Sequence, residues 1–294
     1  MATPTQRAEA RRLSRTATRR AAVLDQLSRR FGRELSRVLR ELERGLLARL
    51  PAIQARSRTA LIDASSALAL RRELRDALRD AGYDDLILTG SERAFTRLER
   101  VVGGTTVGRE VARFVTPDRA LDVLRALRVL QVTGLEYQGD TVATELWHTL
   151  TRRLYTQTSV RDLVRALAVK IDRSERETRT LYDTATATYT RVRQAMDVPD
   201  DPSEAWLYAG PDDLKTRPFC EAHVDRVYSR QAIDQMDNDT PDLADVFRYG
   251  GGYNCRHVWM HVPKGTSLAD LADTGEDVGP SLGLPKRVPR TKAA

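Results

Sequence analysis

The chain of 294 residues carries a formal net charge of +7 and is long enough for two modest domains, or for one domain with extended arms. With 41% hydrophobic and 30% charged residues, we expect a folded core beside a large solvated or partner-facing surface. The N-terminal stretch MATPTQRAEARRLSRT lacks the apolar segment of a secretory signal peptide, and no run of apolar residues is long enough to predict a membrane span. Two cysteines are too few for a disulfide scaffold. These features predict a soluble protein made in a cytoplasm.

The positive charge is concentrated at the two ends of the chain. Residues 1–50 hold 13 arginines against five acidic residues, and the last ten residues add four more cations. Such clusters are typical of a surface that contacts a polyanion, most simply a nucleic acid backbone. A solvated arginine-rich helix face is the alternative. The candidate nucleic-acid-binding residues are Arg7, Arg11, Arg12, Arg15, Arg19, Arg20, Lys286, Arg287, Arg290 and Lys292.

The first 200 residues have the apolar spacing of helices. Apolar residues from Leu24 to Leu46 follow steps of three and four, which predicts one long helix that Pro51 ends. Helix starts are predicted near Pro117, Asp140 and Ser159, the last as a capping box with Asp162, and a final long helix is expected over about 174–196.

The composition changes after Pro199, where extended pieces are predicted at AWLYA, DRVYS and RHVWMHV. The predicted fold is therefore mainly α, with a long N-terminal helix and helical body, then a small α+β module and a basic tail. The predicted divisions are an N-terminal helical arm and helices over 1–135, further helices over 136–198, a Cys/His module over 199–265, and a flexible basic tail over 266–294.

Both cysteines lie beside histidines, in the stretches TRPFCEAH and GGGYNCRHVW. Cys220 and His223 can share one turn, and Cys255 and His257 can share one face of an extended segment. Two thiolates and two imidazoles form the ligand set of a structural zinc ion. A bound metal ion would add much to the stability of a module this small. A Cys220–Cys255 disulfide and two unbonded buried thiols are the alternatives.

A catalytic interpretation of this cluster is also open. Asn254 beside the Cys/His cluster is similar to small zinc-supported nucleases that use a His–Asn–His set. A metal-dependent nuclease using His223, Asn254 and His257 is therefore the alternative function. However, the paired His-Asp or His-His of a first strand is missing, and no P-loop, dinucleotide-binding, nucleophile-elbow or zincin stretch occurs. We therefore expect no enzymatic activity.

Residues around the cysteines resemble a known family. The stretch from residue 206 to 263 is similar to the C-terminal segment of phage head morphogenesis proteins, the minor head proteins related to the F protein of phage Mu. The similarity covers roughly residues 140–263, so that 136–198 corresponds to the helical part of the head-morphogenesis domain. Many relatives have His-Pro-Asn where Gly252-Tyr253-Asn254 stands here, which removes one possible ligand. The matching residues are Asp213, Thr216 to Cys220, Val227 to Ser229, Gly252 to His257, and Trp259.

The resemblance implies a low-copy structural component of a tailed-phage head, assembled in the bacterial host cytoplasm. Its implied partners are the phage portal protein, a capsid or scaffold protein, and packaged double-stranded DNA in the head interior, with no membrane contact. Basic ends around an acidic body suit a protein that is anchored on a partner while its arms contact phosphate. Some relatives carry a toxin domain after the motif, but the 31 residues after Pro263 are too few for one.

Overall fold

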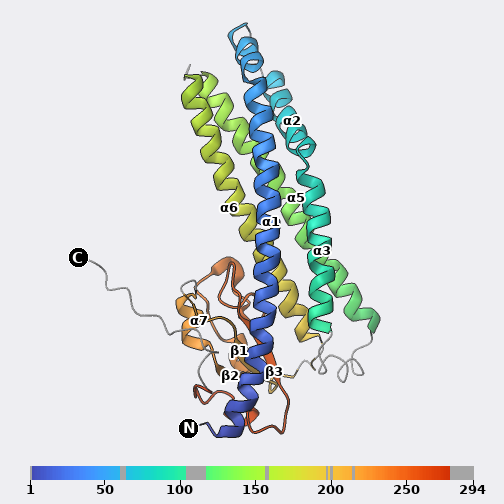
Figure 1. The fold of residues 1–294 in the computed structure, drawn as a ribbon, viewed down its shortest axis with the longest axis vertical. Coiled ribbons are helices and arrows are strands. Elements are labelled where there is room, and N and C mark those ends of the chain that lie inside the picture. The colour runs from blue at the N-terminus through green and yellow to red at the C-terminus, as the bar shows by residue number, and fades with distance from the viewer. Residues whose placement is uncertain are drawn as a thin grey trace, which may run out of the picture. The chain divides into compact units, whose positions relative to one another are not determined.

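The computed structural model is mainly helical, with a small antiparallel sheet near the C-terminus (Figure 1), and this confirms the predicted fold class. Within the part of the chain that it describes, no helix is long and apolar enough to cross a membrane. The described residues are 2–59, 64–103, 117–155, 159–196, 198, 201–213 and 216–278.

The chain forms two compact units. The first, here called the sheet unit, contains residues 1–26, 95–126 and 183–294, and the second, the helical unit, contains residues 27–94 and 127–182. These units differ from the predicted sequential division, because residues 1–26 belong to the same unit as the C-terminal module.

Long helices supply most of the described residues. Two of them are longer than predicted, because α1 continues through Pro51 and α5 continues through Asp140. The Asp140 carboxylate does not cap a helix but accepts a hydrogen bond from Arg75 Nε at 2.6 Å. The helix predicted over about 174–196 is the second half of α6. The bounds are α1 Pro4–Thr59, α2 Ala64–Asp80, α3 Tyr83–Gly103, α5 Pro117–Tyr155 and α6 Val160–Ala195.

Ser159 caps the start of α6, which is one half of the predicted capping box. Ser159 Oγ accepts a hydrogen bond from the Asp162 backbone N at 3.2 Å and donates to the Asp162 carboxylate at 2.7 Å. This pair satisfies a backbone N–H that the first helical turn leaves without an intrahelical partner.

The helical unit is held together by apolar stripes of its helix segments. The Phe31 ring of α1 stacks on the Tyr182 ring of α6, with centroids 3.8 Å apart. Leu35 of α1 and Leu78 of α2 are fully buried, as the spacing of three and four residues predicts for α1. Burying each such leucine contributes about 2 kcal/mol.

Tyr83 is a buried phenol in the helical unit. Its Oη donates a hydrogen bond to the Leu135 carbonyl at 3.2 Å, and burial raises its pKa to about 12. Since the unfolded phenol ionises near pH 10, its contribution to stability is complete below pH 10 and is lost as the pH rises toward 12.

This shift predicts an alkaline destabilisation that depends on Tyr83. The difference in unfolding free energy between the wild type and Tyr83→Phe should shrink by about 2 kcal/mol between pH 9 and pH 12. Urea unfolding at several alkaline pH values measures it. A pH-independent difference would contradict the prediction.

The sheet has the strand order β2-β1-β3, with both pairs antiparallel. β1 spans Ala205–Ala209, β2 spans Arg226–Ser229 and β3 spans Val258–Val262. All three lie within the predicted extended pieces, which are rich in β-branched and aromatic residues.

Both faces of β1 are buried, so the sheet is a middle layer. Leu207 and its neighbours on one face pack against Ala10, Leu13 and Ala17 in the first turns of α1. The first residues of the chain are therefore a cover for the sheet and not a free arm. Trp206 and Tyr208 point to the other face, toward the short helices α7 (Pro218–His223), α8 (Arg230–Asp234) and α9 (Val246–Tyr249) and the 3-10 turn at Pro241–Leu243.

The predicted flexible tail begins later than expected. Leu268 and Val278 are 0% and 1% exposed in the core beside the sheet, and the Val278 backbone N donates to the Asp225 carbonyl at 3.0 Å. A 3-10 turn spans Ala269–Leu271. Ala269, Leu271 and Ala272 pack against the same core, so the prediction for 266–278 was wrong.

Candidate metal centre

Cys220, Cys255 and His257 meet on the face of the sheet that carries Trp206 and Tyr208. Cys220 lies in α7, which begins at Pro218, a residue suited to the first helical position. Cys255 and His257 lie in the loop between α9 and β3. All three side chains are buried, with Cys220 and His257 each 2% exposed.

The donor atoms of these three residues lie within 4.8 Å of one another. The Cys220 and Cys255 sulfurs are 3.7 Å apart, and Cys255 Sγ is 3.9 Å from His257 Nδ1. His257 Nε2 has no hydrogen-bond partner among the described residues. A buried imidazole without an outside partner is a group that a bound cation can satisfy. The three residues can therefore hold a metal ion.

The sulfur separation differs from that of a disulfide, one of the three predicted alternatives. A disulfide requires an S–S distance of about 2.05 Å, and both cysteines are free in the structure. Two metal–sulfur bonds of about 2.3 Å at a tetrahedral angle place their sulfurs about 3.8 Å apart. The observed 3.7 Å matches this spacing, and it also permits a hydrogen bond between two thiols.

Tyr208 of β1 completes the cluster. Its Oη lies 3.3 Å from Cys220 Sγ and 3.4 Å from Cys255 Sγ, and its ring stacks on the His257 imidazole. The side chain is 0% exposed, and burial raises its pKa well above the ordinary value. As a neutral phenol, Tyr208 donates to one of the two sulfurs.

Glycines make room for the cluster. A Cβ on Gly251 would lie 2.4 Å from Cys220 Sγ, and a Cβ on Gly210 would lie 2.6 Å from His257 Cδ2. Gly250 adopts φ +58 and would place its Cβ 2.9 Å from Cys255 Sγ. The glycines of the GGGYNC stretch are therefore explained by close contact with the sulfurs and by left-handed backbone.

Arg191 of α6 fixes the loop that carries Cys255 and His257. Its guanidinium donates to the His257 carbonyl at 2.9 Å, to the Cys255 carbonyl at 2.6 Å and to the Arg248 carbonyl at 3.3 Å. The residue is only 4% exposed. A planar guanidinium can serve several carbonyls at once, which a lysine cannot do.

The two sulfurs have opposite protonation preferences. The pKa of Cys255 lies well below its ordinary value, chiefly because of the hydrogen bond with Cys220, and the positive charge of Arg191 and the nearby His257 lower it further against the effect of burial. The pKa of Cys220 is raised by its hydrogen bond with Cys255 and by burial. These opposite shifts favour loss of the proton from Cys255 before Cys220, and a thiolate is the form that binds metals.

His223, the fourth predicted ligand, is not part of this group. Its Nδ1 is hydrogen-bonded to the Phe219 carbonyl at 2.7 Å, and its ring stacks between Phe219 and Tyr228. The sequence spacing within one helical turn is correct, but the side chain packs along α7 and not toward the sulfurs. Tyr208, Arg191 and Gly210 were not predicted as site residues, because nothing in their local sequence marks them.

Other residues that match the head-morphogenesis pattern support the same module. Arg256 Nη1 donates to the Asp213 carboxylate at 2.8 Å, and Arg217 Nη1 donates to the Gly251 carbonyl at 3.1 Å. Trp259 Nε1 donates to the Val246 carbonyl at 3.1 Å. These residues hold the loops around the cluster in place.

The candidate nucleic-acid-binding residues differ in exposure. Arg20 is only 3% exposed and donates to Met260 Sδ at 3.4 Å, so it lies on the covered side of α1. Its position three residues after Ala17 and four before Leu24 already continues the apolar stripe. Lys286, Arg287, Arg290 and Lys292 lie outside the described residues, and the exposed candidates are Arg7, Arg11, Arg12, Arg15 and Arg19.

Comparisons of the chain with protein-family models, with curated proteins and with solved structures find no match.

Proposed function

We propose that this protein is a structural minor head protein of a tailed phage, present in few copies and associated with the portal and the packaged DNA. The observation that carries the proposal is that the residues of the head-morphogenesis pattern build a closed, buried Cys/His cluster. A site whose donor atoms are buried from solvent stabilises a module and offers no position for a substrate.

The metal of this site is proposed to be zinc. Two thiolates and an imidazole are donors that zinc prefers, and structural zinc sites take four ligands in a tetrahedron. Cys220, Cys255 and His257 would fill three of the four positions, and the Tyr208 hydroxyl, 3.3 Å and 3.4 Å from the two sulfurs, would donate a hydrogen bond to a bound thiolate. When bound, zinc would link α7 to the loop before β3.

The nuclease alternative gains no support from this geometry. His257 is 2% exposed and faces the sulfurs, so a scissile phosphate has no route to its ring. A general base must lie within hydrogen-bonding reach of the reacting groups.

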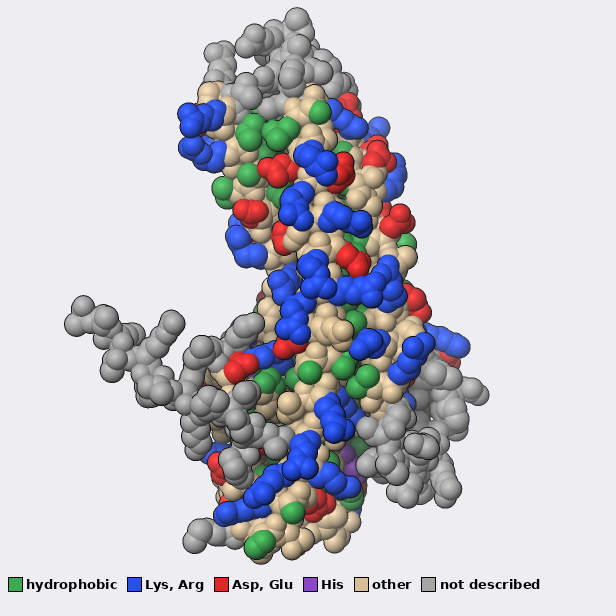
Figure 2. Space-filling model, in the orientation of Figure 1, with side chains coloured by type: hydrophobic (Ala, Val, Ile, Leu, Met, Phe, Trp, Pro, Cys, Tyr) green, Lys and Arg blue, Asp and Glu red, His purple; other side chains and the backbone are tan. Residues whose placement is uncertain are grey.

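Contact with DNA is proposed for the exposed side of the first turns of α1. Figure 2 shows Lys and Arg side chains gathered in a band over the N-terminal part of this helix. Arg7, Arg11, Arg15 and Arg19 follow one another at steps of four, so they form one row on the side opposite the apolar contacts. Such a row suits phosphate contacts without sequence preference.

Replacing Arg7, Arg11 and Arg15 by glutamine tests this surface. We expect the slope of log affinity for duplex DNA against log salt to fall by about 2.7, because each phosphate contact contributes about 0.9. Substitution is preferable to deletion of residues 1–20, since Ala10 and Leu13 cover the sheet. An exposed triple variant on α2, Arg71, Arg72 and Arg79 to glutamine, is the matched control. Equal slopes in both variants would contradict the assignment.

The head role is tested by quantitative mass spectrometry of purified particles and of DNA-free proheads from the phage or prophage that encodes the chain. We expect a few copies in both, in constant ratio to the portal protein. Absence from both kinds of particle would overturn the proposal.

A further inference from the structure

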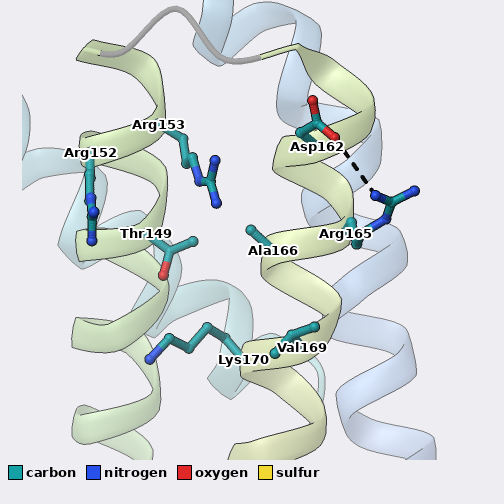
Figure 3. Close-up of a pocket in the computed structure, with 8 residues that line it drawn as sticks. All are labelled: Thr149, Arg152, Arg153, Asp162, Arg165, Ala166, Val169 and Lys170. Carbon is teal, nitrogen blue, oxygen red and sulfur yellow. Dashed lines mark ion pairs between the residues drawn. The ribbon is translucent and has the colours of Figure 1, made fainter.

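A pocket of about 500 Å³ lies between the last turns of α5 and the first turns of α6, within the helical unit. Its volume falls in the range of about 300–1,000 Å³ that small-molecule sites occupy. Figure 3 shows the Arg153 side chain of α5 and the Lys170 side chain of α6 directed into the space between the helices, with Thr149 between them. The lining residues are Thr149, Arg152, Arg153, Asp162, Arg165, Ala166, Val169 and Lys170.

The charge of this lining is strongly positive. Four cations stand against one acid, Asp162, and the Asp162 carboxylate is already engaged by Ser159 Oγ at 2.7 Å and by Arg165 at 3.9 Å. Lys170 is held in place by Glu145 of α5 at 3.1 Å. A concave surface lined by one sign of charge concentrates counter-ions of the opposite sign.

The chemistry of the lining selects the kind of anion. A guanidinium binds the oxygens of a phosphate in a bidentate manner, and an ammonium adds a point charge. Beside these groups, Ala166 and Val169 form an apolar wall, and Val169 is 61% exposed. The pocket therefore offers contacts to the phosphate of a ligand and to an apolar part of the same ligand.

We propose that this pocket binds a phosphate group carried by an organic molecule, with Arg153 and Lys170 contacting the phosphate oxygens. The phosphate can come from a free nucleotide or from a nucleic acid strand. The site is independent of the metal cluster, of the basic row on α1 and of the head role.

Titration calorimetry of the full chain with adenosine triphosphate, and in a second arm with short duplex DNA, tests this site. We expect one nucleotide per chain, and a loss of affinity of about tenfold or more in Arg153→Gln/Lys170→Gln, because charge-assisted hydrogen bonds are lost. Arg173→Gln/Arg176→Gln is the matched control, since it removes two exposed cations of α6 outside the pocket. Loss confined to the nucleotide arm identifies a free phosphate ester as the ligand, and loss confined to the DNA arm identifies a strand.

Two outcomes would overturn the proposal. One is equal weakening in the pocket variant and the control variant, which would mean diffuse attraction by arginines. The other is unchanged binding, or no binding, in both arms. Hydrogen exchange of the wild-type chain provides a readout that needs no variant: adenosine triphosphate should protect residues 149–153 and 162–170 selectively, and uniform protection would count against the site.

Discussion

Cys255→Ser is expected to remove the bound metal and to lower the unfolding free energy sharply. Cys255 Sγ lies close to two other groups of the cluster, 3.4 Å from Tyr208 Oη and 3.7 Å from Cys220 Sγ. A ligand that binds only the folded state, at a thousand times its dissociation constant, stabilises by about 4 kcal/mol. Losing the metal should therefore cost about this amount, because metal affinity is coupled to folding.

Elemental analysis of metal per chain and thermal unfolding measure this result. A chelator should lower the melting temperature of the wild type and leave Cys255→Ser unchanged. His223→Ala is the matched control, since His223 stacks on Phe219 outside the three-residue group, and it should retain one metal per chain. A wild-type chain that is metal-free and insensitive to chelator would contradict the zinc proposal, and metal loss in His223→Ala would restore His223 as a ligand.

Arg191→Met is expected to destabilise the sheet unit by about 3 kcal/mol or more. The change removes the donor of the buried Cys255 and His257 carbonyls and of the partly buried Arg248 carbonyl. Buried carbonyls without a donor cost about 1–3 kcal/mol each. It should also weaken metal binding, because the loop that carries two of the ligands is no longer held against α6.

Urea unfolding of three variants shows whether the planar guanidinium of Arg191 or its positive charge stabilises the loop. Arg191→Lys keeps the charge but cannot serve three carbonyls, so it should lie nearer to Arg191→Met than to the wild type. Arg193→Met is the control on the same helix, where one partly buried ion pair with Glu99 at 3.1 Å is lost. We expect a cost of about 1 kcal/mol there. A stability of Arg191→Met equal to that of Arg193→Met would show that Arg191 is not needed to hold the loop.

Local patterns of the sequence determined the element types and the centre of the site. The β-branched and aromatic pieces identified all three strands, and the steps of three and four from Leu24 identified the buried face of α1. The two Cys/His stretches pointed to the cluster that Cys220, Cys255 and His257 form. The strand and helix predictions succeeded because each depends on interactions within a few residues.

Where elements end, and which side chains complete the site, was decided by the tertiary structure. Asp140 has the character of a helix cap, yet Arg75, 65 residues away, binds its carboxylate, and α5 continues through it. Leu268 and Val278 lie in a segment whose sequence predicts a flexible tail, but in the structure they are buried against the sheet. His223 has the spacing of a ligand, but its imidazole gains more contacts from Phe219 and Tyr228.

Arg191 and Tyr208 show the physical reason most clearly. Arg191 bonds to carbonyls 57 to 66 residues later in the chain, and Tyr208 reaches sulfurs 12 and 47 residues away. Such contacts exist only after β1, α6 and the loop before β3 have packed together. The sequence alone determined that Cys255 and His257 lie near each other, since that follows from local spacing. Only the folded chain decided which buried donors and charges surround them, because burial and hydrogen bonding over long sequence distances are properties of the packed core.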